Sequence, residues 1–367
     1  MKRTLITGGG GHIGLAVARR LVAEERPVCL FLHAQSREEA EEKQACLEPL
    51  FDGHRGLVAF AAGTMRAEDP FSAVNSQDIS EVLHTASIIR FNVEAEDADA
   101  VNVAGARKAL AFARQCKYLE GFSLVSSLYA TGLAAGGIPE ALLPDSPGFA
   151  NHYERSKWEA ETLLATAQDV PWRIFRVATI MADDDSGIYS QTNAVHNTIR
   201  LLYYGLISVI PGLPETPLYM VTRDFVVAAI TGLMRRPAHQ RVYHVAHPWA
   251  CNPTLETLLD IAFEEFGEDP GFKRRRVLRP LYTDLDAFQA LASGMAGYQS
   301  SVIAQALATL TPFAPQLFIT KDFETHWLRQ DWPEYTPMAG AAVARAVVRQ
   351  GLASRFGKAP SQQEVAG

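Results

Sequence analysis

The sequence predicts an α/β fold with a doubly wound parallel (Rossmann) sheet and a smaller, mostly helical C-terminal region. Three observations predict it: a glycine-rich turn between a strand and a helix at the start of the chain, an alternation of strand and helix patterns to about residue 185, and the loss of that alternation afterwards. Ligands of such sheets bind beyond the carboxyl ends of the strands. We therefore expect the functional residues where the predicted strands end.

The first element is a short apolar strand, Thr4 to Thr7, which runs directly into a glycine-rich turn and then a helical pattern. The turn is expected to aim backbone N–H groups at the pyrophosphate of a dinucleotide. Gly8 permits the tight turn, Gly11 lets the backbone approach phosphate, and Gly14 lets the helix pack on the strand. The predicted cofactor-binding residues here are Thr7, Gly8, Gly10, Gly11, His12, Ile13 and Gly14.

Further strands and helices follow in alternation. Apolar runs predict strands at 27–32, 57–61, 79–84, 121–127 and 172–177. Helical patterns lie between them at 37–50, 97–116 and 153–167. Beyond residue 185 the pattern predicts helices at 193–204, 223–234, 254–266 and 338–356, a strand at 242–245, and mostly short helices from about 270 to 330.

These patterns divide the chain into two regions. We expect a dinucleotide-binding domain over residues 1–185, with further elements of the same domain near 220–250. Residues 186–356 are expected to form mainly the helical, substrate-binding region, and residues 357–367 a disordered tail. The length of 367 residues suits one large or two modest domains.

Composition narrows the class of protein. A hydrophobic content of 48% is ample for a packed core, and a net charge of −7 argues against general nucleic-acid binding. No uncharged apolar window of about 18 residues predicts a membrane span, and the immediate first strand argues against a signal peptide. The four cysteines are scattered, as expected of reduced thiols in a cytoplasmic protein, and no residue cluster predicts a metal site.

A tyrosine and a lysine, Tyr153 and Lys157, stand four residues apart in a predicted helix. Their side chains therefore lie on one helix face, about 5–6 Å apart at Cβ. A free tyrosine has a pKa of about 10, too high for acid–base work at neutral pH. A nearby ammonium favours the phenolate and lowers that pKa. The pair therefore predicts a general acid/base, although a surface Tyr–Lys pair would have the same spacing.

Polar residues at strand ends accompany this pair. Ser126 and Ser127 end the strand predicted at 121–127, where a hydroxyl can donate a hydrogen bond to a substrate carbonyl. Asn102 lies in the helix that follows the strand ending at His84. All of these side chains are expected at the same edge of the sheet.

The chain order of these motifs resembles that of the extended short-chain dehydrogenases/reductases, whose T-G-x-x-G-x-x-G turn matches residues 7–14. The match covers about residues 3–250. The resemblance implies an NAD(P)-dependent oxidoreductase with four catalytic residues: Tyr153 as acid/base, Lys157 binding the nicotinamide ribose and tuning the tyrosine, Ser127 as the catalytic hydroxyl, and Asn102 as a supporting polar residue. It also implies further cofactor contacts from Thr85, Ala86, Ser126 and Lys157.

The end of the second strand bears on which nicotinamide cofactor binds. An NAD site usually carries an acid there that accepts from the ribose 2′-OH, but residues 31–37 contain none. His33 and Arg37 can instead face a 2′-phosphate, for which the planar guanidinium is well suited. NADPH is therefore expected rather than NAD; the alternative is that Arg37 simply begins a solvated helix. Thr64 stands where relatives often carry an aspartate on the adenine side.

Within this class, several phrases resemble the fatty acyl reductases and terminal thioester reductase domains, the male-sterility-type branch. Residues 79–91 resemble their fourth strand, with its H-x-A-A-x-(I/V)-x-F pattern. Residues 31–40 resemble their strand-two phrase, with His33 where they carry arginine.

The clearest of these phrases is the helix that carries the Tyr–Lys pair. Residues 153–161 match Y-x-x-S-K-W-x-x-E. Trp158 and Glu161 are the residues that distinguish this branch from other short-chain reductases. Arg176 matches an arginine at the end of the next strand, although Val177 replaces the usual proline.

The resemblance implies hydride delivery to the acyl carbon of a thioester. Tyr153 and Ser127 would stabilise the developing oxyanion, and the hemithioacetal would release a thiol and an aldehyde. A second NADPH would give the alcohol. We expect the acyl group on coenzyme A or on a separate carrier protein, since no adenylation or carrier domain is recognisable.

Relatives often dimerise through two helices of the Rossmann domain, which makes a homodimer a further expectation.

One basic cluster interrupts this acidic chain: Lys273, Arg274, Arg275, Arg276 and Arg279. Coenzyme A and carrier proteins are both anionic, so the cluster could dock either one, or it could be an exposed loop of solvated charges. Apolar segments at 201–210 and 298–318 could wall an acyl tunnel, and core packing explains them equally well.

Three other functions are compatible with much of the same sequence. An NADPH-dependent ketone or aldehyde reductase, of the hydroxysteroid or dihydroflavonol type, shares the Ser–Tyr–Lys set and lacks only the branch-specific phrases. A non-catalytic nicotinamide-sensing protein would be expected to have lost the Tyr–Lys pair, whereas both residues are present here. A sugar-nucleotide epimerase would favour an acid near His33.

Overall fold

Seven parallel strands form a sheet in the computed structural model, which describes residues 1–295 and 302–356. These strands are β1 (Arg3–Thr7), β2 (Val28–His33), β3 (Val58–Gly63), β4 (Ile79–His84), β5 (Gly121–Ser127), β7 (Trp172–Val177) and β11 (Arg241–Val245). Their order is β11-β7-β5-β4-β1-β2-β3, so the chain winds outward from β1 in both directions. The predicted doubly wound fold class is confirmed.

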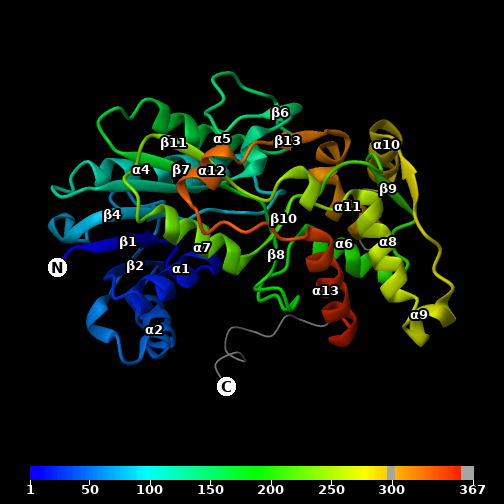
Figure 1. The fold of residues 1–367 in the computed structure, drawn as a ribbon, viewed down its shortest axis with the longest axis horizontal. Helices are drawn as coiled ribbons and strands as arrows, with labels where there is room; N and C mark the ends of the chain where they lie inside the picture. The colour runs from blue at the N-terminus through cyan, green and yellow to red at the C-terminus, as the bar shows by residue number, and fades with distance from the viewer. Residues whose placement is uncertain (296–301, 357–367) are drawn as a thin grey trace.

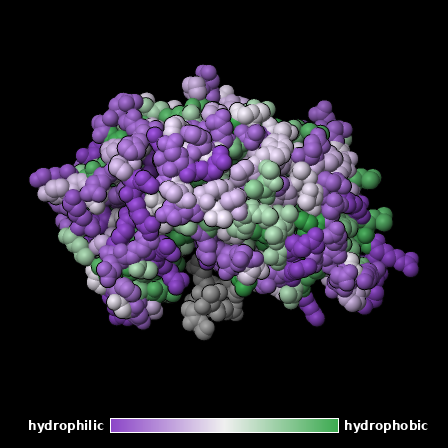
Figure 2. Space-filling model, in the orientation of Figure 1, coloured by the Kyte–Doolittle hydropathy of each residue, from purple (hydrophilic) through white to green (hydrophobic). Residues whose placement is uncertain are grey.

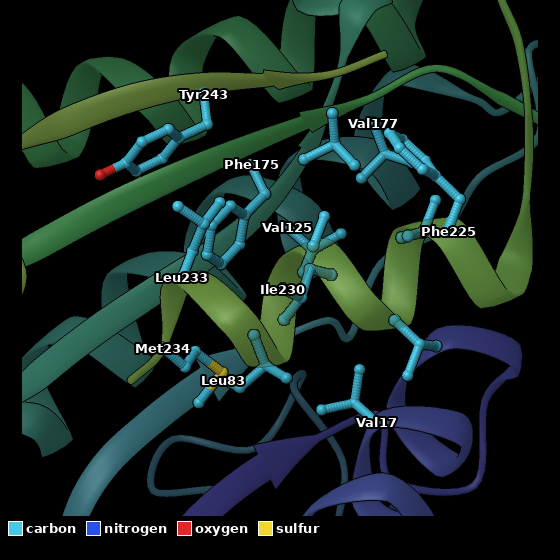
Figure 3. Packing of buried hydrophobic residues seen from close by; sticks show 14 of the residues in the cluster. Val17, Leu83, Val125, Phe175, Val177, Phe225, Ile230, Leu233, Met234 and Tyr243 are labelled. Atoms are coloured by element: carbon cyan, nitrogen blue, oxygen red, sulfur yellow. The ribbon is translucent and has the colours of Figure 1, made fainter. Parts of the chain in front are cut away.

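Helices cover both faces of this sheet. They are α1 (His12–Ala23), α2 (Arg37–Leu47), α4 (Ala104–Ala113), α5 (His152–Ala165) and α7 (Arg223–Leu233). On one face, Val17 of α1 and Ile230 of α7 pack among buried residues of β4, β5 and β7 (Figure 3). On the other face, Ala109 of α4 and Leu164 of α5 share a core with Phe122. The two layers hold the carboxyl ends of the strands in fixed positions.

The helix predicted at 97–116 is interrupted near its start. A short helix α3 (Ala95–Ala98) leads into a π-helical turn, Asp99–Val103, before α4 begins. Such turns are rare and frequently accompany functional sites. This one carries Asn102, which is buried.

The second region is mostly helical and lies beside the sheet, on the right in Figure 1. Its helices are α6 (Ala194–Tyr203), α8 (Leu255–Phe266), α9 (Pro270–Arg275), α10 (Leu285–Met295), α11 (Val302–Leu310) and α13 (Gly340–Ala353). The helix α12 (His326–Asp331) returns to contact β11. Short 3-10 segments are η1 (Glu48–Phe51), η2 (Arg55–Leu57), η3 (Ser76–Asp78), η5 (Leu128–Thr131), η6 (Trp249–Cys251) and η8 (Thr311–Phe318).

Three parallel two-stranded pairs connect distant parts of the chain. They are β8 (Thr179–Ala182) with β10 (Met220–Thr222), β9 (Val209–Pro211) with β12 (Leu281–Thr283), and β6 (Gly136–Ile138) with β13 (Lys321–Phe323). The sequence analysis predicts none of these strands, because three or four residues are too few for alternation to show. The tail predicted at 357–367 lies outside the described residues.

Candidate active site

The turn between β1 and α1 has the geometry of a phosphate-binding loop. Gly8 adopts a φ of +66°, a left-handed conformation that favours glycine. A Cβ on Gly14 would lie 2.4 Å from the carbonyl oxygen of Gly8, so no side chain fits there. Gly11 caps α1 without a side-chain hydrogen bond, and the first turn of α1 contains no acid. Its N–H groups are therefore left for an anionic ligand, which fits the pyrophosphate of a dinucleotide.

Thr7 and His84 join this turn to β4. The Thr7 hydroxyl accepts hydrogen bonds from the backbone N–H groups of Thr85 (3.1 Å) and Ala86 (3.2 Å). Its own proton is then directed at Nδ1 of His84, 2.8 Å away. Burial, reinforced by the charge of Lys157, lowers the pKa of His84 to about 3, so the imidazole is neutral. The predicted cofactor residues Thr85 and Ala86 are thereby held against the glycine turn.

His12, the first residue of α1, connects the turn to the second region. Its Nδ1 lies 3.2 Å from the Ser190 hydroxyl, and its Nε2 lies 3.9 Å from the Asp183 carboxylate. Arg223 donates to the Ser190 hydroxyl (3.1 Å) and pairs with Asp183 (3.2 Å). Burial and the Arg223 charge lower the pKa of His12 to about 4. The sequence analysis misses this cluster, since its members come from three distant segments.

Three predicted catalytic residues meet at the carboxyl end of β5. Ser127 shares a side-chain hydrogen bond with Tyr153 and accepts another from the N–H of Tyr129 (3.2 Å). The Nζ of Lys157 lies 5.9 Å from the centre of the Tyr153 ring and donates to the carbonyl of Val125 at 3.1 Å. The arrangement presents two linked hydroxyls with a buried amine beside them.

The electrostatics of Tyr153 differ from the expectation that a nearby ammonium lowers its pKa. Burial raises the pKa of Tyr153 to about 12, and the hydrogen bond with Ser127 only opposes that rise. Burial also lowers the pKa of Lys157 to about 8, with the Glu161 charge acting in the other direction. The ring is enclosed, and Phe91 packs edge-on against it at 5.4 Å. The resting tyrosine is therefore protonated and suited to donate.

Asn102 ties the loop after β4 to helix α5. Its amide oxygen accepts from the N–H of Ile88 (2.8 Å) and the hydroxyl of Ser87 (3.0 Å). Its amide nitrogen donates to the carbonyl of Ile88 (3.0 Å) and to the hydroxyl of Ser156 (2.8 Å). Ser156 in turn donates to the carbonyl of Tyr153 (2.8 Å). Through Ser156, Asn102 therefore links the loop after β4 to the backbone that carries the tyrosine.

Ser126 and Ser127 lie next to one another but have different partners. Ser126 donates to the Glu161 carboxylate at 2.6 Å, and Arg176 pairs with the same carboxylate at 2.7 Å. Both charged side chains are at most 1% exposed. His244 completes the network, 3.3 Å from Arg176. The sequence analysis identifies Glu161 and Arg176 only as residues that match the pattern of the reductase branch. Nothing in their spacing indicates that they form a buried ion pair.

The residues predicted at the 2′-phosphate lie on the exposed edge beyond β2. His33 ends β2 and is exposed. The Arg37 side chain, at the start of α2, is 91% exposed and pairs with Glu41 at 2.6 Å. Lys43, which the sequence does not single out, donates to the carbonyl of His33 at 2.7 Å. Two cations therefore flank the end of β2.

An apolar pocket adjoins the tyrosine. Phe91 packs against Tyr153, against Tyr129 at 5.0 Å and against Phe313 at 6.0 Å. Tyr129 and Phe313 also line a pocket with a volume of about 70 Å³. Other residues that line it are Thr179, Val195, Leu218, Met220, Leu317 and Lys321. Its mostly apolar lining suits a ligand with an apolar part.

The two segments predicted to wall a tunnel contribute unequally to this pocket. The segment 298–318, of which 298–301 lie outside the described residues, supplies Phe313, Gln316 and Leu317. The segment 201–210 supplies no lining residue, because Leu202, Ile207 and Ile210 belong to the buried core of the second region.

Known proteins share this fold. The model of the male sterility protein family matches residues 6–230. The terminal R domain from the myxalamid PKS-NRPS biosynthetic pathway superposes with a TM-score of 0.76 at 17% identity, covering 98% of this chain and 93% of that one. A thiolation-reductase di-domain from an archaeal non-ribosomal peptide synthetase gives 0.72 at 16% identity, covering 97% and 76%. UDP-glucuronic acid 4-epimerase from Bacillus cereus, in complex with NAD, gives 0.66 at 15% identity, covering 95% and 99%. No curated protein sequence matches the chain.

The glycine turn, the parallel sheet and the Tyr–Lys pair together define an NAD(P)-dependent oxidoreductase of the extended short-chain dehydrogenase/reductase class. Within that class, the chain belongs to the male sterility protein family, whose model covers more than half of it. The family resemblance noted in the sequence is thereby confirmed.

Two further observations concern the described part of the chain. Within residues 1–295 and 302–356, no group of three or more histidine, cysteine, aspartate and glutamate side chains is placed to hold a metal ion. Over the same residues, no helix has the length and apolar character that crossing a membrane requires.

Proposed function

We propose that the protein reduces the acyl group of a thioester with NADPH and releases a thiol and an aldehyde. The observation that carries the proposal is the hydrogen-bonded pair of Ser127 and Tyr153 beside an apolar pocket. The pair suits a carbonyl oxygen, and the pocket suits the acyl chain that follows it. The family and the reductase domains among the structural neighbours favour a thioester as the source of that carbonyl.

The nicotinamide supplies a hydride when it is bound. The glycine turn would hold the pyrophosphate, and Lys157 would bind the ribose. Ser127 and Tyr153 would donate hydrogen bonds to the acyl oxygen and stabilise the negative charge that develops there. Because burial keeps the pKa of Tyr153 at about 12, this hydroxyl enters the reaction protonated and can give its proton to that oxygen.

The product of these steps is a hemithioacetal. Its hydroxyl proton is lost as the C=O bond re-forms, the C–S bond breaks, and the sulfur takes up a proton. The aldehyde and the thiol then leave. The same hydroxyl pair would serve a second reduction, from aldehyde to alcohol.

We propose NADPH as the cofactor because Arg37 and Lys43 lie beside the exposed end of β2. Replacing Arg37 with glutamate should raise the KM for NADPH about tenfold and leave the KM for NADH little changed. Arg55→Glu is a matched control, since Arg55 is also exposed and pairs with a carboxylate close in sequence, Asp52. Equal effects of the two substitutions would contradict the assignment.

The test of the proposed reaction is NADPH consumption with thioesters, aldehydes and ketones, with the free thiol titrated in parallel. We expect thiol release with thioesters. Activity on ketones alone would instead indicate the ketone reductase. Tyr153→Phe should lower kcat by about 10²- to 10⁴-fold while the Kd for NADPH stays the same. Unchanged turnover in this variant would overturn the mechanism.

A further inference from the structure

The basic cluster of the sequence separates into two groups in the structure. Arg275 is committed to the fold: its guanidinium lies 4.4 Å from the centre of the Tyr203 ring and donates to the Tyr203 carbonyl at 2.8 Å. Arg279 pairs with Glu256 (2.7 Å) and Asp260 of α8. These two arginines hold α9 and the following segment in place.

The remaining three cations of the cluster, Lys273, Arg274 and Arg276, are all exposed. Within the part of the chain that the structure describes, none of their side chains has a hydrogen-bond or ion-pair partner. Arg276 ends α9 in a left-handed conformation, with φ +51°, where the chain turns toward β12. The three charges are therefore available to a ligand.

Two leucines follow these cations at once. Leu278 is 83% exposed and Leu281, the first residue of β12, is 73% exposed. Figure 2 shows hydrophobic and hydrophilic side chains projecting together at the right-hand edge, where α9 and the segment to β12 lie in Figure 1. We call the five residues Lys273, Arg274, Arg276, Leu278 and Leu281 the α9 surface.

This surface belongs to the substrate side of the molecule. Leu281 pairs with Val209 of β9, and β9 contacts η8. η8 carries Phe313, which lines the pocket and packs against Phe91 beside Tyr153. The α9 surface is therefore connected to the wall of the proposed acyl pocket through β12, β9 and η8.

We propose that the α9 surface docks an acidic carrier protein that presents the acyl thioester; this inference rests on the proposed function. The chain has a net charge of −7, so an acidic protein is repelled over much of its surface and attracted where cations are unpaired. The leucines favour a protein partner over coenzyme A alone. Apolar contacts at the centre of an interface stabilise a protein complex, whereas they add nothing to binding a phosphate.

The test compares one acyl group on three thiols. The acyl group is one that the unmodified protein reduces as a pantetheine thioester, and it is also supplied on coenzyme A and on a purified acidic acyl carrier protein. The variant is Lys273→Glu with Arg274→Glu. We expect kcat/KM to fall at least about tenfold with the carrier thioester and to stay unchanged with the pantetheine and coenzyme A thioesters. In the variant, kcat/KM with the carrier thioester should also depend less on ionic strength.

A matched control carries Arg19→Glu with Lys117→Glu, which changes the net charge by the same amount. Both residues are exposed; Arg19 lies in α1 and Lys117 in the turn after α4. Leu278→Asp tests the apolar part and should reduce carrier-dependent activity as well. The proposal is overturned if control and variant behave alike, if activity with the coenzyme A thioester falls equally, or if the unmodified protein reduces the small thioesters but not the carrier thioester. If the unmodified protein reduces no acyl pantetheine thioester at all, so that no such acyl group can be chosen, the proposed function itself is contradicted.

Discussion

Ser127 and Tyr153 share a side-chain hydrogen bond across the junction between β5 and α5. Ser127 is the last residue of its strand, and Tyr153 is in the first turn of its helix. The bond therefore depends on how the strand end and the helix start are placed, and both placements are fixed by buried layers on the two faces of the sheet.

This hydrogen bond gives a direct test of the oxyanion site. Ser127→Ala should lower kcat by about 10²- to 10³-fold, because it removes one of the two donors. Ser123→Ala is a matched control on the same strand, since the Ser123 hydroxyl is buried and has no partner among the described residues. Steady-state kinetics would decide, and equal losses in the two variants would show that Ser127 acts only through packing.

The lysine beside the pair should make cofactor affinity depend on pH. Burial lowers the pKa of Lys157 to about 8. The anionic cofactor stabilises the ammonium form of Lys157, so the pKa of Lys157 is higher in the complex than in the free protein. Affinity should therefore be constant below pH 8 and fall as the pH rises above it. Fluorescence titration with NADPH between pH 6 and pH 10 would measure this, and Lys157→Met should remove the dependence.

The buried pair of Glu161 and Arg176 predicts a stability change. Arg176→Met leaves a carboxylate buried without its cation, which should cost about 3–5 kcal/mol of unfolding free energy. The double variant Glu161→Leu with Arg176→Met should recover part of that loss, because no unpaired charge remains. Urea unfolding measures both. Arg114→Met, which breaks an exposed pair with Asp169, should have little effect.

Substitution by alanine should have very different effects on NADPH affinity at two glycines of the cofactor turn. A Cβ on Gly14 would meet the carbonyl oxygen of Gly8 at 2.4 Å, so Gly14→Ala must open the turn. We expect at least about a tenfold loss of NADPH affinity. A Cβ on Gly10 meets only the side chains of Leu47 and Leu32, at 3.5 Å and 3.6 Å. Gly10→Ala should therefore fold and bind normally, and similar affinities for both variants would contradict this account.

Local patterns predict the frame of this site well. The glycine turn, the strand end at Ser127 and the Tyr153–Lys157 pair each depend on a few neighbouring residues, whose periodicity is visible in the sequence. The seven strands of the sheet are predicted for the same reason, and each lies within a few residues of its expected position.

Contacts between distant segments are not predictable in this way. The link from His12 to Ser190 spans 178 residues and comes from tertiary packing alone. The pKa of Tyr153 could not be inferred from the spacing of Lys157, because burial is the largest influence on it and raises it. Nor does the sequence show that Arg275 of the basic cluster is used to anchor α9.

The position of α13 has a consequence for how the protein is made. This last described helix packs against α8, β8 and β10, and Ala346 lies so close to Gly187 that no side chain fits between them. Ribosomes add about 5–20 residues per second, so the apolar faces of these elements stay uncovered until α13 has emerged from the ribosome. The Rossmann sheet also needs β11 from late in the sequence. Newly made chains therefore pass through an interval of exposed apolar surface, in which chaperone binding competes with folding.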